Sequence, residues 1–269
     1  MKDCKALWLG EKRQLFALQH QPSGAPADTG VLILNAGLLH NVGPFHLHVL
    51  LGRALAESGF VVTRLDQSGK GESARRKGVK RNDSILQDYD DALESMAPFG
   101  VRKLVIVGLC SGADDGSFIA AKRDSVVGLV SFDGYAHRNL QFYAGHYLRR
   151  VFSPSAVSRI ARRLARLFDS SQSDGGDPAG LDIRDWASDD EMLARFATLV
   201  DRGGKVLSVF TSGQDYYNYH GQLADNLRGK VSLESVDEDY HPLVDHTFST
   251  QLDRTELVAR VTSWLQTNY

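Results

Sequence analysis

The stretch KLVIVGLCSG, residues Lys103–Gly112, decides how this chain folds. Its apolar first half predicts a buried strand, and the residues that follow predict a helix over Ser111–Lys122. Between the two, Cys110 has one glycine two positions before it and another two positions after it. A sharp strand-to-helix turn brings backbone segments close together there, so both flanking positions must be small. Centring the turn on Ser111 would place Leu109 at one of them, which favours Cys110 as the central residue.

Apolar runs alternate with amphipathic stretches on both sides of this turn. This alternation predicts a mostly parallel central sheet with helices on both faces. A short opening hairpin is predicted over Ala6–Leu9 and Gln14–Gln19. The other predicted strands are Val31–Leu34, Phe60–Leu65, Lys103–Val107, Val126–Phe132, Lys205–Phe210 and Val231–Val236. The other predicted helices are Phe45–Ser58, Ser84–Met96, Tyr217–Leu227 and Gln251–Gln266.

One region interrupts the alternation. No strand is evident from Tyr135 to Gly203, where the pattern indicates helices and a polar stretch rich in Ser, Gly and Asp. We therefore expect an α/β core made of residues 1–134 and 204–269, with residues 135–203 forming a helical cap over the site.

Composition narrows the possible functions. The chain has 269 residues, a hydrophobic share of 42% and a net charge of −2, which is typical of one globular domain. That charge gives no general attraction to nucleic acid, and no apolar run is long enough to predict a membrane span. Two cysteines do not make a disulfide scaffold, and the start lacks a signal-peptide pattern, so we expect a reduced, cytoplasmic protein.

Cys110 is the candidate nucleophile. The following helix would direct its N-terminus at the sulfur, which favours the thiolate and supplies backbone N–H groups. The alternative is a buried cysteine that merely packs as a small apolar residue. The glycines on both sides and the strand–helix context favour the nucleophile.

Partners for this thiol are expected just after later strands. Asp215, which follows the predicted strand Lys205–Phe210, is the preferred acid, and Asp133 is the reserve candidate. For the base, His246 lies nearer the terminal helix than His241 and is preferred. The predicted triad is therefore Cys110, His246 and Asp215.

The loop after Val31–Leu34 is expected to complete the site. Gly37 permits an unusual backbone turn there, and the N–H groups of Leu38 and Ser111 are the predicted oxyanion donors. Gly37 and Leu39 are the predicted substrate contacts. No metal or other cofactor is expected, because the nearby histidines, His40, His46 and His48, lack a cysteine or carboxylate at ligand spacing.

Together, the segments LILNAG, GPFHLHV, LDQSGKGES, GLCSGA, SGQD and DHTF resemble the α/β-hydrolase superfamily. Within it, the chain resembles the bacterial exosortase-associated and related uncharacterised hydrolases, and the cysteine turn is similar to that of dienelactone hydrolase. The resemblance covers residues 31–134 and 204–266. It implies the α/β-hydrolase fold and acyl chemistry on an ester, a thioester or a related bond.

The expected activity is thus that of a thioesterase, esterase or acyltransferase with a thioacyl-enzyme intermediate. Within the predicted cap, residues Tyr147–Phe168 carry several arginines around an apolar helical stripe. One interpretation is a basic helix face exposed to solvent. Two others are a docking surface for an acidic acyl carrier protein and a surface that binds an anionic membrane. A non-catalytic binding protein with this fold is the alternative function, and a haloperoxidase or lyase is a third.

Overall fold

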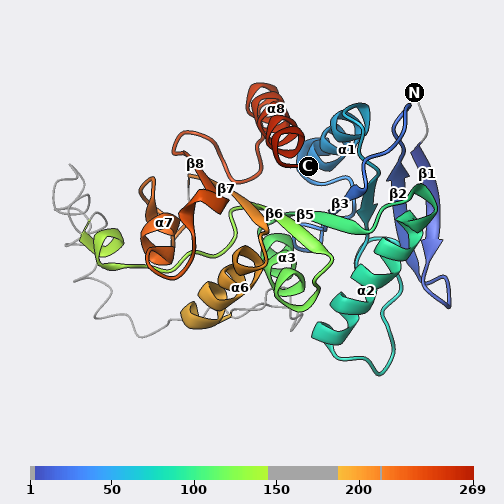
Figure 1. The fold of residues 1–269 in the computed structure, drawn as a ribbon, viewed down its shortest axis with the longest axis horizontal. Helices are drawn as coiled ribbons and strands as arrows, with labels where there is room; N and C mark the ends of the chain where they lie inside the picture. Colours follow the sequence, from blue (N-terminus) through green and yellow to red (C-terminus); the bar gives the residue numbers. More distant parts are fainter. Residues whose placement is uncertain (1–3, 145–186, 213) are drawn as a thin grey trace, which may run out of the picture.

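An eight-stranded sheet forms the centre of the computed structural model, which describes residues 4–144, 187–212 and 214–269. The strands are β1 (Cys4–Leu9), β2 (Leu15–His20), β3 (Thr29–Ile33), β4 (Val62–Leu65), β5 (Lys103–Leu109), β6 (Val126–Phe132), β7 (Lys205–Thr211) and β8 (Val236–His241). They lie in the order β1-β2-β4-β3-β5-β6-β7-β8 (Figure 1). The first two strands form an antiparallel hairpin, β2 pairs antiparallel with β4, and the strands from β4 to β8 are parallel.

Helices cover both faces of this sheet (Figure 1). Helices α1 (Leu47–Glu57) and α8 (Gln251–Asn268) lie on one face, and α2 (Arg81–Met96), α3 (Ser111–Lys122) and α6 (Asp189–Asp201) lie on the other. The shorter helices are α7 (Gln222–Leu227) and the 3-10 turns η1 (Pro44–His46), η2 (Ala97–Phe99) and η3 (Leu233–Ser235). Two separate hydrophobic clusters, one on each face, form the core. The predicted mostly parallel sheet with helices on both faces is confirmed.

The central strands are apolar on both faces because both faces are covered. In β5, Val105 and Val107 face the cluster beside α1 and α8, while Leu104 and Ile106 face the cluster beside α2 and α3. All four side chains are excluded from solvent. Continuous apolar runs are typical of parallel strands that are covered on both faces. For this reason the bounds predicted for β5 and β6 lie close to those in the structure.

The last strand differs from its prediction. The apolar run Val231–Val236 was expected to form it, but β8 begins at Val236 and consists mainly of polar residues. The strand lies at the edge of the sheet and pairs only with β7, so it is incompletely covered and needs no apolar run. Val231 instead precedes η3.

Helix α6 falls in the range predicted for the cap, yet it packs against the core. Its side chains Met192, Phe196 and Leu199 belong to the same cluster as Ile119 of α3. Residues 145–186, which include the basic stretch of the predicted cap, lie outside the described residues.

The chain order around the sheet creates the position for a site. In the sheet, β4 lies on one side of β3, and the next strand in sequence, β5, lies on the other side. In open α/β sheets, ligands bind beyond the carboxyl ends of the strands where such a reversal occurs. The loops that follow β3, β4 and β5 meet at this edge, and Cys110 follows β5 directly.

Candidate active site

The backbone at Cys110 makes a tight turn between β5 and α3. Cys110 has φ 56° and ψ −120°, an uncommon conformation for a residue other than glycine. Its N–H donates to the carbonyl oxygen of Phe132 at 2.8 Å, and its own carbonyl accepts from the N–H of Ala113 at 2.9 Å. Strained backbone of this kind persists when the surroundings hold it, and it is common at functional sites.

Two glycines make this turn possible. A Cβ atom at Gly108 would overlap with the backbone of Gly112, and a Cβ atom at Gly112 would overlap with the carbonyl oxygen of Asn35. The strand, the helix and the loop after β3 therefore approach one another more closely than any larger residue permits. The prediction that both positions flanking Cys110 must be small is confirmed.

The Gly112→Ala variant should be destabilised by about 1–3 kcal/mol, because the added methyl group must displace the backbone at Asn35. In an unconstrained helix, replacing glycine by alanine raises stability by up to about 1 kcal/mol. A net loss of stability would therefore show that the added methyl group clashes with the backbone. Thermal unfolding measures it, with Gly24→Ala as the control, since a Cβ at Gly24 meets nothing within 4 Å. An unchanged Tm for Gly112→Ala would contradict the tight approach.

His246 is the histidine that reaches the thiol. It lies between β8 and α8, and its Nδ1 is 2.7 Å from Oδ2 of Asp133. The hydrogen bond with Asp133 raises the pKa of His246 to about 9, and a hydrogen bond with Cys110 is the second cause. His241 is the exposed last residue of β8. The structure thus brings together Cys110 and His246, as predicted.

The carboxylate that contacts His246 belongs to Asp133, the reserve candidate. Asp133 follows β6 directly, has φ 47° and is fully buried. Its Oδ1 accepts from the N–H of Thr211 at 2.7 Å, and its Oδ2 accepts from the Thr211 hydroxyl at 2.5 Å. Because both oxygens are held by β7, the carboxylate keeps a fixed position against the imidazole.

Asp215, the preferred acid of the sequence analysis, does not lie in this position. It is exposed, and in the described part of the chain no hydrogen bond or ion pair joins it to His246. The neighbouring residue reaches the imidazole instead, since the side-chain amide of Gln214 lies 2.7 Å from the same Nδ1. An amide can present either its oxygen or its NH₂ group, and only the oxygen accepts from an imidazolium.

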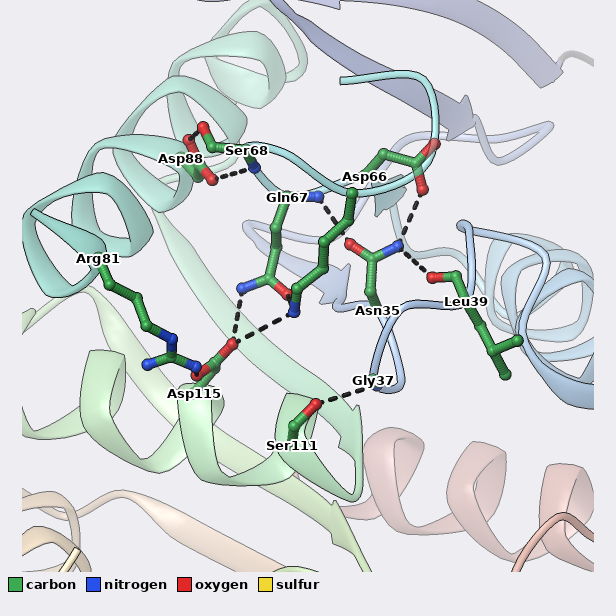
Figure 2. Close-up of polar contacts among 11 residues, drawn as sticks. Asn35, Gly37, Leu39, Asp66, Gln67, Ser68, Arg81, Asp88, Ser111 and Asp115 are labelled. Carbon is green, nitrogen blue, oxygen red and sulfur yellow. Dashed lines mark hydrogen bonds and ion pairs between the residues drawn. The ribbon is translucent and has the colours of Figure 1, made fainter. Parts of the chain in front are cut away.

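The loop after β3 lies against the start of α3. The N–H of Gly37 donates to the Ser111 hydroxyl at 2.9 Å, and Gly37 has φ 56° (Figure 2). Leu38 and Leu39 are exposed, and the Leu39 carbonyl accepts from the Asn35 side chain at 2.8 Å. Across the described residues, neither the Leu38 N–H nor the Ser111 N–H has a hydrogen-bond acceptor. These two predicted oxyanion donors therefore belong to segments that contact each other.

Two other features concern cofactors and membranes. Among the residues that the structure describes, no group of three or more His, Cys, Asp or Glu side chains is arranged to hold a metal ion. In the same residues, no helix combines the length and apolar character needed to cross a bilayer.

Several site residues were not singled out by their position in the sequence. Asp66 and Asn35 are both fully buried and hydrogen-bonded to each other at 2.9 Å. Each directly follows an apolar strand segment, which is the signal that could have found them. Gln214 carried no such signal.

Comparisons with known proteins agree with this architecture. No protein-family model matches the chain, and no curated protein matches its sequence. Solved structures do match: proline iminopeptidase of Mycobacterium smegmatis aligns with a TM-score of 0.59 at 16% identity, over 99% of this chain and 98% of that one. The thioesterase domain from the curacin biosynthetic pathway aligns with a TM-score of 0.59 at 13% identity, over 98% of this chain and 99% of that one. An esterase domain from Rhodothermus marinus aligns with a TM-score of 0.58 at 13% identity, over 98% of this chain and 97% of that one. The sheet order, the turn at Cys110 and these likenesses together show that the chain has the α/β-hydrolase fold.

Proposed function

We propose that this chain is an acyl-transfer enzyme, a thioesterase, esterase or acyltransferase, that forms a thioacyl intermediate on Cys110. The observation that carries the proposal is the contact series from Cys110 to His246 to Asp133 at the turn after β5. A nucleophile, a base and a group that orients the base are the three parts that such chemistry requires.

Electrostatics indicate the resting state of the pair. With a pKa of about 9, His246 is an imidazolium at neutral pH. Its positive charge favours the thiolate of Cys110, and the N-terminus of α3 adds to this effect. A thiolate attacks a carbonyl carbon without first losing a proton, so Cys110 is ready to react before the substrate binds.

Acylation then follows in two steps. The sulfur of Cys110 forms a bond to the acyl carbon, and the carbonyl oxygen becomes an oxyanion beside the N–H groups of Leu38 and Ser111. As the oxyanion collapses, the bond to the leaving alcohol or thiol breaks, and His246 donates its proton to that group. Gly37 and Leu39 lie in the same loop and are the proposed contacts to the substrate.

Deacylation reverses the roles. Neutral His246 removes a proton from water or another acceptor, whose oxygen or other nucleophilic atom attacks the thioacyl carbon. The carbon–sulfur bond breaks, the acyl group leaves on the acceptor, and the thiolate–imidazolium pair forms again. Throughout, Asp133 holds the imidazole with Nδ1 facing its carboxylate and stabilises the positive charge.

The substrate class is a further part of the proposal. Two of the structurally similar proteins are described as a thioesterase and an esterase, which favours an acyl thioester or ester over other bonds. The expected acyl carrier protein would dock on residues Tyr147–Phe168, which lie outside the described residues, so carrier docking stays a prediction from the sequence.

Alkylation with iodoacetamide tests the thiolate directly. At pH 6, Cys110 should be labelled faster than the exposed Cys4, which serves as an internal control. His246→Ala should slow the Cys110 reaction by about 10- to 100-fold, because the thiolate loses its imidazolium partner. Peptide mapping after timed quenching measures both rates.

Labelling of Cys4 alone would contradict the proposed site. The non-catalytic alternative predicts a different outcome, in which no ester or thioester in a broad panel is turned over beyond the rate of Cys110→Ala.

A further inference from the structure

A buried carboxylate with no part in the proposed triad lies beside the loop after β3. Asp66 follows β4 and is fully excluded from solvent. Its Oδ1 accepts from the Asn41 N–H at 2.6 Å and the Asn35 side-chain amide at 2.9 Å. Its Oδ2 accepts from the Asn41 side-chain amide at 2.9 Å and the Glu72 N–H at 3.1 Å. Buried charge is costly unless it is hydrogen-bonded, and here four donors surround it.

Three of these four hydrogen bonds come from the two ends of one loop. Asn35 is at its beginning and Asn41 at its end, so one carboxylate closes residues 35–41 into a fixed ring. Asn35 adds two bonds of its own, donating to the Leu39 carbonyl at 2.8 Å and accepting from the Gln67 N–H at 2.6 Å. Figure 2 shows Asn35 between Asp66 and Leu39.

On its other side, the same loop contacts the helix that carries the thiol. The Gly37 N–H donates to the Ser111 hydroxyl, and the carbonyl oxygen of Asn35 lies against Gly112. Leu38, the proposed oxyanion donor, is between these attachments. Its N–H can keep a constant position relative to Cys110 only if Asp66 and α3 hold the loop together.

We infer that Asp66 is a positioning residue that sets the oxyanion donor of Leu38 through the loop 35–41. The inference rests on the proposed function. An oxyanion donor must lie about 2.7–3.1 Å from the developing charge, and loss of one such donor costs about 10²- to 10³-fold in kcat. A small displacement of the loop should therefore lower acyl turnover without affecting the sulfur.

Two reactions of the same thiol separate this role from a general structural one. Alkylation by iodoacetamide forms a sulfur–carbon bond and expels iodide from a saturated carbon, so no oxyanion develops. Attack on an acyl thioester does develop an oxyanion. In the described contacts, Asp66 touches neither Cys110 nor His246, so a change at Asp66 should slow only the second reaction.

The first test variant is Asp66→Asn, which keeps the shape of the side chain but turns one acceptor into a donor. That donor would face N–H groups of Asn35 or Asn41. With hexanoyl N-acetylcysteamine as the substrate, kcat should fall by about 10²-fold with little change in KM. The rate constant for alkylation of Cys110 should stay within about twofold of wild type, because thiolate formation depends on His246.

The chain offers a matched control. Asp88 is another buried carboxylate in the same region, but it accepts from Ser68, as Figure 2 shows, and from Arg76 rather than from the loop 35–41. Asp88→Asn should leave both kcat and alkylation near wild type. A second probe is Gly71→Ala, since a Cβ at Gly71 would overlap with the Asp66 carboxylate and displace it without removing it. Gly71 has φ 51°, so the alanine also strains the backbone, and the measured Tm separates that cost from the loss of turnover. Gly71→Ala should reproduce the selective loss of turnover, and it replaces Asp66→Asn if that variant does not fold.

The outcomes separate clearly. Loss of turnover with preserved alkylation supports the inference. Unchanged turnover in both variants overturns it, and so does a parallel loss of turnover and alkylation in folded protein, which would show a purely structural role. Wild-type protein that alkylates at Cys110 but turns over no acyl thioester or ester would overturn the proposed function and this inference with it.

Discussion

Asp133→Asn should lower kcat for acyl turnover by about 10²- to 10⁴-fold, whereas Asp215→Asn should keep the wild-type rate. The amide that replaces the Asp133 carboxylate cannot accept from Nδ1 as a carboxylate does, and it cannot stabilise the imidazolium by charge. Asp215 is exposed and has no described contact with His246. Steady-state kinetics of the two variants, compared side by side, measure the difference directly.

The same pair of variants should differ in their pH dependence. The pKa of His246 is raised to about 9 with the Asp133 hydrogen bond as the largest cause, so the imidazolium persists below about pH 9 and is lost above it. The alkaline limb of kcat/KM should therefore lie near pH 9 in the wild type. Asp133→Asn should move this limb to lower pH. A limb that moves in Asp215→Asn and not in Asp133→Asn would restore Asp215 as the acid.

Cys110→Ala should abolish acyl turnover, with a loss on the order of 10⁴-fold or more. The chain has no second thiol at the turn, and the neighbouring Ser111 hydroxyl is buried and accepts from the Gly37 N–H. The oxyanion donors that remain stabilise charge only after a nucleophile has attacked the acyl carbon. Cys4→Ala is the matched control, because Cys4 lies on β1 at the opposite edge of the sheet from β8. It should keep wild-type kinetics.

Thermal unfolding checks the interpretation of this loss. The Cys110→Ala variant removes one atom from a partly exposed position and should keep a wild-type-like Tm. Turnover that survives in folded Cys110→Ala would contradict a thioacyl mechanism.

The turn at Cys110 could be predicted from the sequence because it is a local feature. Two glycines, a preceding apolar run and a following helix lie within a short stretch, and the contacts that require Gly108 and Gly112 involve the turn itself and the neighbouring loop. The central strands were located for a related reason. Burial on both faces produces long apolar runs that a pattern can detect.

The acid could not be chosen in the same way. Asp133 and Asp215 each follow a strand of the same sheet, and β6 and β7 end side by side. The backbone at Asp133, with φ 47°, and its bonds to Thr211 decide which carboxylate reaches the imidazole. Neither periodicity nor spacing encodes these features.

The position of β8 and the role of Asp66 also depended on tertiary structure. Edge strand β8 lacks the apolar run that identified the others, because it is only partly covered. The function inferred for Asp66 depends on four hydrogen bonds, of which those from Asn35 and Asn41 join residues 31 and 25 positions apart in the chain. In the sequence, the segment LDQSGKGES that contains Asp66 was noted only because it resembles the α/β-hydrolase superfamily.

The most direct test of the account is the mass of the enzyme during turnover. Wild-type protein mixed with a hexanoyl thioester and quenched in acid after milliseconds should carry one hexanoyl group, which peptide mapping should place on Cys110. The adduct should be absent from Cys110→Ala and should decay as the product appears. A hexanoyl group on Ser111 or any other residue, or product formation with no covalent adduct at any quench time, would contradict the thioacyl mechanism.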